Sequence, residues 1–159
     1  MQSDQPELHT GITPMRLDSL SEVMKIEEEA HLFPWSEKIF QDCINANYSS
    51  WVYLYEQQVI GYSITTMAAG EGHILNICVD PAHQGQGYGK LLLENIFDTA
   101  MKNDIKVVFL EVRPSNLVAI TLYEKHGFHE VGRREKYYPA KRGREDALIM
   151  ARVLFKGDD

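Results

Sequence analysis

A glycine-rich segment between an apolar run and an amphipathic helix is the part of the sequence best suited to bind an anion. The segment Gln84–Lys90 places three glycines, Gly85, Gly87 and Gly89, within five residues. Glycine allows backbone N–H groups to approach an anion closely, and the positive end of a helix dipole strengthens the attraction. A turn without a ligand is the alternative, but this density of glycine favours a phosphate or pyrophosphate site.

Two common phosphate-binding loops do not fit this segment. A dinucleotide-binding G-x-G-x-x-G motif counted from Gly85 would need its third glycine where Lys90 stands. A P-loop that contains Gly89 would need a glycine in place of Gln84 and Ser or Thr in place of Leu91. The pattern that remains is Q-x-x-G-x-G, beginning at Gln84.

Two side chains further along the chain could act on protons. Glu111 lies in the apolar run Val107–Val112, where a carboxylate is costly unless it is exposed at an edge, paired or functional. Pairing with Arg113 or another cation is therefore the alternative to a role as general base. Tyr123, on a helix predicted for Asn116–His126, could donate a proton, although the residues alone favour a packed helix tyrosine.

The cysteines and histidines offer less chemistry. Cys78 could carry an acyl group, but it lies between Ile77 and Val79 without a neighbouring charge that would indicate a reactive thiolate. We therefore predict that it is an inert apolar filler. Neither the cysteines nor the histidines have the spacing of metal ligands, so we predict no metal.

The elements that position these residues follow from apolar periodicity and turn signals. Strands are predicted at His9–Leu17, Trp51–Tyr55, Val59–Met67, His73–Val79, Lys106–Val112, Phe128–Tyr138 and Asp146–Leu154. Helices are predicted from Asp18 or Ser19 to about Ala30, after Ser36 as N-cap, over Tyr88–Met101, and over Asn116–His126 with Gly127 as its stop. A polar loop is predicted at Pro139–Glu145. This order predicts an α/β (α+β) fold with a mixed sheet, in one domain spanning 1–159 with 1–8 loose.

Composition indicates the compartment and the kind of partner to expect. The net charge of −7 argues against direct nucleic-acid binding and is compatible with a basic partner or with plain solubility. The polar, acidic start of the chain does not resemble a signal peptide, and no apolar stretch is long enough for a membrane span. With only two cysteines, we expect a reduced cytoplasmic protein, and we expect it to be a monomer.

The Q-x-x-G-x-G segment resembles the coenzyme-binding motif of the GNAT acetyltransferases, whose backbone amides hold the pyrophosphate of acetyl-CoA. The resemblance extends from about Ile12 to Leu154. It implies a mixed sheet of about seven strands flanked by four helices, with the fourth and fifth strands splayed around the pantetheine arm. The backbone along the pantetheine would be that of Ile77, Cys78 and Val79. The pyrophosphate would be held by Gln84, Gly85, Gln86, Gly87, Tyr88, Gly89 and Lys90.

Longer segments resemble one branch of the family, the bacterial ribosomal-protein-alanine N-acetyltransferases. These segments are Ala30–Lys38, Leu110–Asn116, and Tyr137–Pro139 together with Gly143–Met150. The resemblance implies transfer of acetyl from acetyl-CoA to the N-terminal alanine of a small-subunit ribosomal protein, by direct attack in a ternary complex. Archaeal and eukaryotic N-terminal acetyltransferases share parts of the first and last segments. Acetylation of a lysine, a polyamine or another small amine is the alternative activity, and a coenzyme-binding sensor is a third hypothesis.

The resemblance also assigns roles to individual residues. Glu111 would be the general base, and Tyr123 the general acid that protonates the coenzyme A thiolate. Asn116 would contact the coenzyme while capping its helix. The walls of the peptide groove would be formed by Trp35, Tyr137 and Tyr138. Glu37 and Glu145 would either meet basic side chains of the acceptor or lie as solvated surface charges.

Overall fold

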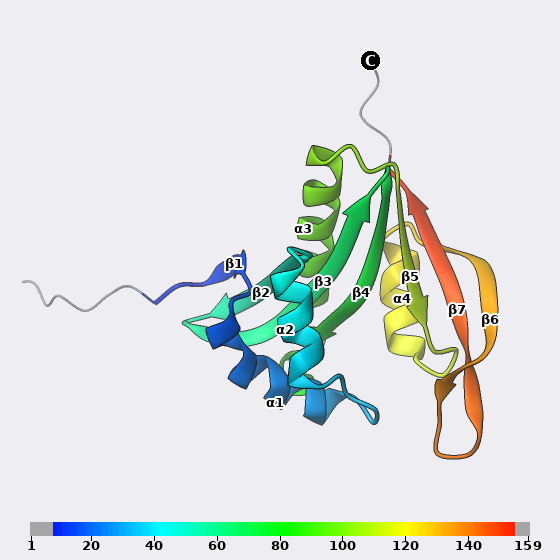
Figure 1. Ribbon diagram of the computed structural model, residues 1–159, viewed down its shortest axis with the longest axis horizontal. Coiled ribbons are helices and arrows are strands. Elements are labelled where there is room, and N and C mark those ends of the chain that lie inside the picture. Colours follow the sequence, from blue (N-terminus) through cyan, green and yellow to red (C-terminus); the bar gives the residue numbers. More distant parts are fainter. Residues whose placement is uncertain (1–7, 155–159) are drawn as a thin grey trace, which may run out of the picture.

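The computed structural model describes residues 8–154 as one seven-stranded mixed sheet with helices on both faces (Figure 1). The strands are β1 Gly11–Pro14, β2 Ser49–Tyr55, β3 Gln58–Ala68, β4 Glu71–Val79, β5 Val107–Val112, β6 His129–Pro139 and β7 Arg144–Val153. The helices are α1 Leu20–Ala30, α2 Glu37–Asn45, α3 Tyr88–Lys102 and α4 Leu117–Lys125. The predicted fold class, with seven strands and four α-helices, is confirmed within the described chain.

The strand order β1-β2-β3-β4-β5-β7-β6 contains one parallel pair, β4 with β5, and all other neighbours are antiparallel. The parallel pairing runs only from Glu71 opposite Val107 to Ile74 opposite Leu110. Beyond that point the two strands diverge, as Figure 1 shows. The expected splay of the fourth and fifth strands is therefore present.

A β-bulge lies where this divergence begins. Asn76 is paired with Ile64 on β3, and Ile74 with Thr65, so Leu75 is the extra residue of β4. A bulge reverses the alternation of side chains and increases the local twist of a strand. Accordingly Ile74 packs in the core beneath α3, whereas Cys78 packs in the core beneath α1.

Two apolar cores cover the two faces of the sheet. One joins α3 and α4 to β5 and β7 and contains Leu93, Ile96, Val108 and Phe128, among other residues. The other joins α1 and α2 to β2 and β3. Each side of the sheet is thus shielded by a helix pair, and the diverging ends of β4 and β5 lie between the two pairs. No helix of residues 8–154 has the length and apolar character that a membrane span requires.

Local signals in the sequence explain where the helices begin and end. The Ser36 side chain accepts a hydrogen bond from the N–H of Ile39, 3.3 Å away, and so caps α2 as predicted. At the end of α4, Gly127 has φ +86°, and the N–H groups of Gly127 and Phe128 donate to the carbonyls of Glu124 and Tyr123. These two bonds form a Schellman motif, which confirms Gly127 as the helix stop.

Some predicted boundaries were wrong. The strand predicted at His9–Leu17 is only β1, because Leu17–Ser19 forms a 3₁₀ turn held by the Ser19 N–H donating to the Arg16 carbonyl. The predicted polar loop Pro139–Glu145 is shorter than expected, because β6 extends to Pro139 and β7 begins at Arg144, which leaves only residues 140–143 as the turn. Residues 1–7 of the segment predicted to be loose lie outside the described residues.

Candidate active site

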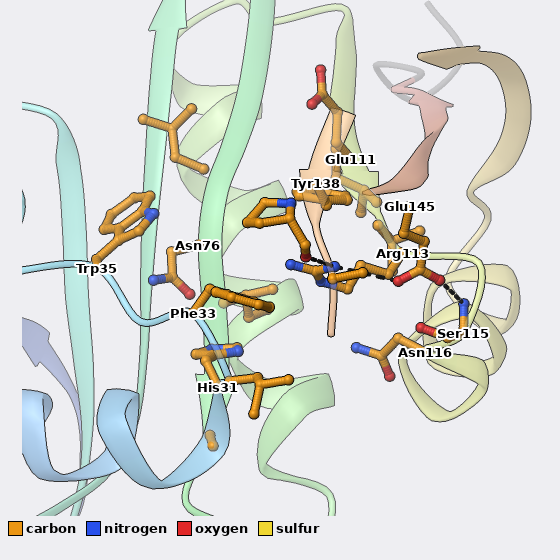
Figure 2. A pocket seen from close by; sticks show the side chains of 18 of the residues that line it. His31, Phe33, Trp35, Asn76, Glu111, Arg113, Ser115, Asn116, Tyr138 and Glu145 are labelled. Atoms are coloured by element: carbon orange, nitrogen blue, oxygen red, sulfur yellow. Dashed lines mark hydrogen bonds and ion pairs between the residues drawn. The ribbon is translucent and has the colours of Figure 1, made fainter. Parts of the chain in front are cut away.

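A pocket of about 740 Å³ opens where β4 and β5 diverge. Its walls come from both strands, the α1–α2 loop, the start of α4 and the β6–β7 turn. Figure 2 shows Phe33, Trp35 and Asn76 on one side, with Arg113, Ser115, Asn116 and Glu145 grouped on the other. The lining includes four of the residues predicted for catalysis or acceptor binding, which are Trp35, Glu111, Tyr123 and Tyr138.

Glu111 reaches this pocket because of the alternation of β5. Val108, Leu110 and Val112 are buried in the core beneath α3 and α4, so the carboxylate points to the opposite face of the sheet. Its Oε1 atom lies 2.8 Å from Nε of Arg134 on β6, and its side chain is 27% exposed. The alternative of pairing with a cation is therefore present, with Arg134 as the partner instead of Arg113.

Tyr123 is buried on α4 and also lines the pocket. Its ring packs against Phe128, with the centroids 5.8 Å apart. Burial raises the pKa of its phenol well above the ordinary value, and the nearby Cys78 and Tyr138 act in the same direction. The phenol therefore keeps its proton across the neutral range and can act as a hydrogen-bond or proton donor.

A polar clasp holds the far side of the pocket together. Arg113 donates to the Pro139 carbonyl at 2.8 Å and to Glu145 Oε1 at 3.3 Å, while Glu145 Oε2 accepts from the Ser115 N–H at 3.0 Å. The pKa of Glu145 is lowered by hydrogen bonding to Ser115, from its side chain foremost and also from its backbone, and by Arg113. Glu145 therefore connects β7 to the β5–α4 segment. This role differs from both predictions for Glu145, which were contact with a basic acceptor or a solvated surface charge.

The aromatic residues predicted for the groove are placed differently from one another. Trp35 and Tyr138 line the pocket, and the Tyr138 ring lies beneath the Arg113 guanidinium, 4.5 Å from its centroid. Tyr137 is not part of that lining; its ring packs against Tyr138 and beneath Arg134. A register shift between Arg134 and Tyr138, with the positive φ of Lys136, interrupts the regular alternation of β6, so the sequence alone does not show which of the two rings lines the pocket.

Asn116 combines a structural role with a position in the pocket wall. Its Oδ1 accepts a hydrogen bond from the N–H of Ala119 at 3.2 Å and so caps α4. Glu37, which was predicted either to meet a basic acceptor or to be solvated, is the first residue of α2 and is exposed.

The glycine-rich segment leads from β4 into α3. Gly85 and Gly87 have φ of +78° and +91°, and a Cβ at either position would have no atom within 4 Å. Gly87 is the N-cap of α3, where no side chain caps the helix. A Cβ at Gly89 would lie 2.9 Å from Cδ2 of Leu122, so glycine permits close packing of α3 on α4. An uncapped N-terminus of a fifteen-residue helix, reached by an unobstructed loop, suits an anion.

Replacing Gly87 by Ala tests this anion site. The left-handed backbone costs Ala about 1–2 kcal/mol, and we expect the loop to relieve this strain by leaving the conformation that binds the anion, so that acetyl-CoA binds about tenfold more weakly in a titration. Gly70→Ala is the matched control, because Gly70 has φ +80° in the β3–β4 turn and equally open space. Both variants should lose similar thermal stability, and equal acetyl-CoA affinities in the two would contradict a coenzyme site at Gly87.

Cys78 lies at the end of β4 on the α1 side and is buried. Burial raises the pKa of its thiol to about 12, outweighing a hydrogen bond with Tyr62 that lowers it. The thiol is therefore protonated at neutral pH, in line with the prediction of an inert filler. Ile77 lines the pocket, while Val79 lies beyond its lining. Among the described residues, no three His, Cys, Asp or Glu side chains gather as metal ligands would.

Sequence reasoning missed two polar residues in the pocket, Glu27 and Asn76. Glu27 on α1 is 2% exposed and forms part of the lining together with Asn76 of β4. A signal was present in the sequence, because Glu27 stands four residues after Val23 and seven after Leu20, on the helix face that should be apolar.

The fold and this pocket agree with what comparison with known proteins finds. Residues 17–128 match the model of the acetyltransferase (GNAT) family. The chain therefore belongs to the GNAT family of acetyltransferases.

Several relatives of the chain are named as ribosomal protein bS18-alanine N-acetyltransferases. The chain is 41% identical over 140 residues to the ribosomal protein bS18-alanine N-acetyltransferase of Escherichia coli K12, covering 88% of this chain and 95% of that enzyme. It is 30% identical over 142 residues to a Bacillus subtilis protein named as a putative enzyme of the same kind, covering 88% and 93%. The crystal structure of the E. coli enzyme superposes with a TM-score of 0.87 at 38% identity, over 95% of this chain and 97% of that one.

Proposed function

We propose that this chain transfers the acetyl group of acetyl-CoA to the α-amine of the N-terminal alanine of ribosomal protein bS18. The observation that carries the proposal is the single pocket at the β4–β5 divergence into which both Glu111 and Tyr123 open. The bS18-alanine N-acetyltransferases at 38–41% identity support the choice of acceptor.

Acetyl-CoA would lie in the gap between the strands. The unpaired edge of β4 from Ile77 to Val79 would run along the pantetheine, and the N–H groups of Gln84–Lys90 would surround the pyrophosphate. Asn116, at the start of α4, would contact the coenzyme from the other side of the gap. An N–H of the β4 edge would then donate to the thioester carbonyl and stabilise the charge that develops on its oxygen.

Glu111 would accept a proton from the acceptor, directly or through a water molecule. An N-terminal α-amine has an ordinary pKa of about 8, so a neighbouring carboxylate suffices to deprotonate it. The α-ammonium carries the same charge as the Arg134 guanidinium and would replace it at Glu111. The freed amine nitrogen attacks the thioester carbon, and the carbon–sulfur bond breaks.

Tyr123 would supply the proton that the departing thiolate needs. Burial raises the pKa of the phenol, and the same apolar surroundings raise the proton affinity of a thiolate formed beside it. The transfer is therefore better matched than the ordinary values of the two groups indicate.

Direct attack, without an acyl-cysteine, leads to a separate expectation. Cys78→Ala should retain turnover within about threefold, because a protonated, buried thiol is a poor nucleophile. Double-reciprocal plots of steady-state rates at varied peptide and acetyl-CoA concentrations should give intersecting lines for the wild type and for Cys78→Ala. Parallel lines in the wild type together with an inactive Cys78→Ala variant would contradict direct attack.

We propose that the protein is a cytoplasmic monomer that acts on a ribosomal protein and does not contact nucleic acid directly. The net charge of −7 supports this choice, because an acidic surface attracts basic proteins and repels phosphate backbones.

The proposal is tested by coenzyme A release with three short basic peptides. One has a free N-terminal alanine, one has a blocked N-terminus and an internal lysine, and one begins with methionine. We expect strong release with the first peptide alone. Release with the blocked lysine peptide would replace the acceptor class, and no release with any of the three would favour a small amine or a sensor.

A further inference from the structure

Glu27 is a buried carboxylate whose hydrogen-bond partners are all donors. Its Oε1 accepts from the Tyr62 hydroxyl at 2.7 Å and from Asn76 Nδ2 at 2.9 Å, and its Oε2 accepts from the Trp35 N–H at 2.9 Å. Nε2 of His31 lies 3.5 Å from Oε1. One side chain thus connects α1 to β3, to β4 and to the α1–α2 loop.

This arrangement fixes which way round the Asn76 amide stands. An ionised carboxylate only accepts hydrogen bonds, so the NH₂ group of Asn76 must face Glu27. The carbonyl oxygen Oδ1 is then on the side of the amide away from Glu27. Because Asn76 lines the pocket, this places a hydrogen-bond acceptor in the pocket wall.

Asn76 and Glu111 stand on opposite sides of the β4–β5 gap and on the same face of the sheet. The bulge at Leu75 turns Asn76 towards α1, and the alternation of β5 turns Glu111 away from the core beneath α3. Both residues line the pocket, which therefore has an acceptor oxygen from each strand in its wall. A primary ammonium has three N–H donors, of which Glu111 takes only one.

We propose that Oδ1 of Asn76 binds the acceptor amine, and that Glu27 is a positioning residue that holds the Asn76 amide for this contact. The inference rests on the proposed function and adds a second recognition element to it. With one N–H bound to Asn76 and another directed at Glu111, the amine nitrogen is held in the gap while Glu111 takes its proton. Glu27 acts at the same time on the Trp35 backbone, so it sets both the amide and the loop beside it.

The test measures the Kd of the free-alanine peptide for the enzyme saturated with coenzyme A, together with the Kd of acetyl-CoA. Asn76→Leu keeps the size of the side chain and removes both polar atoms. Since a hydrogen bond to a charged group is lost, we expect peptide binding to weaken about tenfold or more. The Kd of acetyl-CoA should stay within about twofold, because Asn76 faces the acceptor side.

Glu27→Gln should weaken peptide binding by a similar factor. A glutamine at this position places its NH₂ group opposite the Asn76 NH₂ or the Trp35 N–H, so that two donors face each other. At Asn76 this conflict is removed only when the Asn76 amide rotates, which turns its NH₂ group towards the ammonium. The matched control is Glu22→Gln on the same helix. Oε2 of Glu22 accepts a hydrogen bond of 3.1 Å from the Val59 N–H, and Glu22 is not part of the pocket lining. The control should bind peptide normally.

The double variant separates positioning from general support of the fold. In Glu27→Gln/Asn76→Leu, peptide binding should be no more than about twofold weaker than in Asn76→Leu, because Glu27 acts through Asn76. The inference would be overturned, with wild-type turnover unaffected, if the two substitutions multiplied their effects on the peptide Kd in the double variant. It would also be overturned if Asn76→Leu left the peptide Kd unchanged. A wild type that neither binds nor acetylates the peptide would overturn the proposed function, and this inference with it.

Discussion

Glu111→Gln is expected to lower turnover of the alanine peptide by about 10²–10⁴-fold, the range for loss of a positioned general base. Glutamine keeps the size of the side chain and its hydrogen bonding, but cannot take a proton. The loss should be largest at lower pH, where most of the α-amine is protonated and deprotonation limits the rate. The measurement is the pH profile of turnover, accompanied by the Kd of acetyl-CoA, which should stay nearly unchanged.

Glu130→Gln provides the control for this variant. Glu130 lies on the exposed strand β6 and pairs at 3.9 Å with Arg133, so the variant removes a charge without touching the pocket. It should match the wild type at every pH. Near-normal turnover of Glu111→Gln across the whole pH range would remove Glu111 from the role of base.

Tyr123→Phe is expected to slow the chemical step by about 10²-fold, as for a lost general acid, without abolishing coenzyme binding. The ring and its packing against Phe128 are kept, so stability should change little. Single-turnover acetyl transfer measures the chemical step separately from product release. Tyr55→Phe, at the exposed end of β2, is the control with the same chemical change outside the pocket.

The raised pKa of Tyr123 gives this variant a second readout. Because burial moves the pKa of the phenol upward, the protonated form persists to higher pH than in an ordinary tyrosine. Wild-type turnover should therefore show no alkaline fall up to about pH 10, the ordinary value for a tyrosine. A fall near pH 8, or an unchanged single-turnover rate in Tyr123→Phe, would return Tyr123 to a packing role.

Much of the fold was predictable because its signals are local. The N-cap Ser36 and the stop at Gly127 act through hydrogen bonds within a few residues, and both stand where the sequence placed them. The apolar run of β5 is buried beneath two helices, so Glu111 was conspicuous as its single charge.

The partners of the site residues were less predictable, because they depend on contacts between distant segments. Arg134 reaches Glu111 through the pairing of β6 beyond β7, where register shifts and the positive φ of Lys136 decide which side chains face the pocket. Glu145 closes on Arg113 over a separation of 32 residues. Glu27 was overlooked although the sequence places it on the apolar face of α1, because no local sequence signal indicates which residues its carboxylate contacts.

The position of the acetyl group on bS18 tests the proposed function most directly. Purified bS18 with a free N-terminal alanine would be incubated with the enzyme and acetyl-CoA, and then measured by intact mass and peptide fragmentation. We expect a single acetyl group, on the α-amine of the alanine, with every lysine unmodified. Acetylated lysines beside a free N-terminus, or an unmodified bS18 despite bound acetyl-CoA, would contradict the assignment.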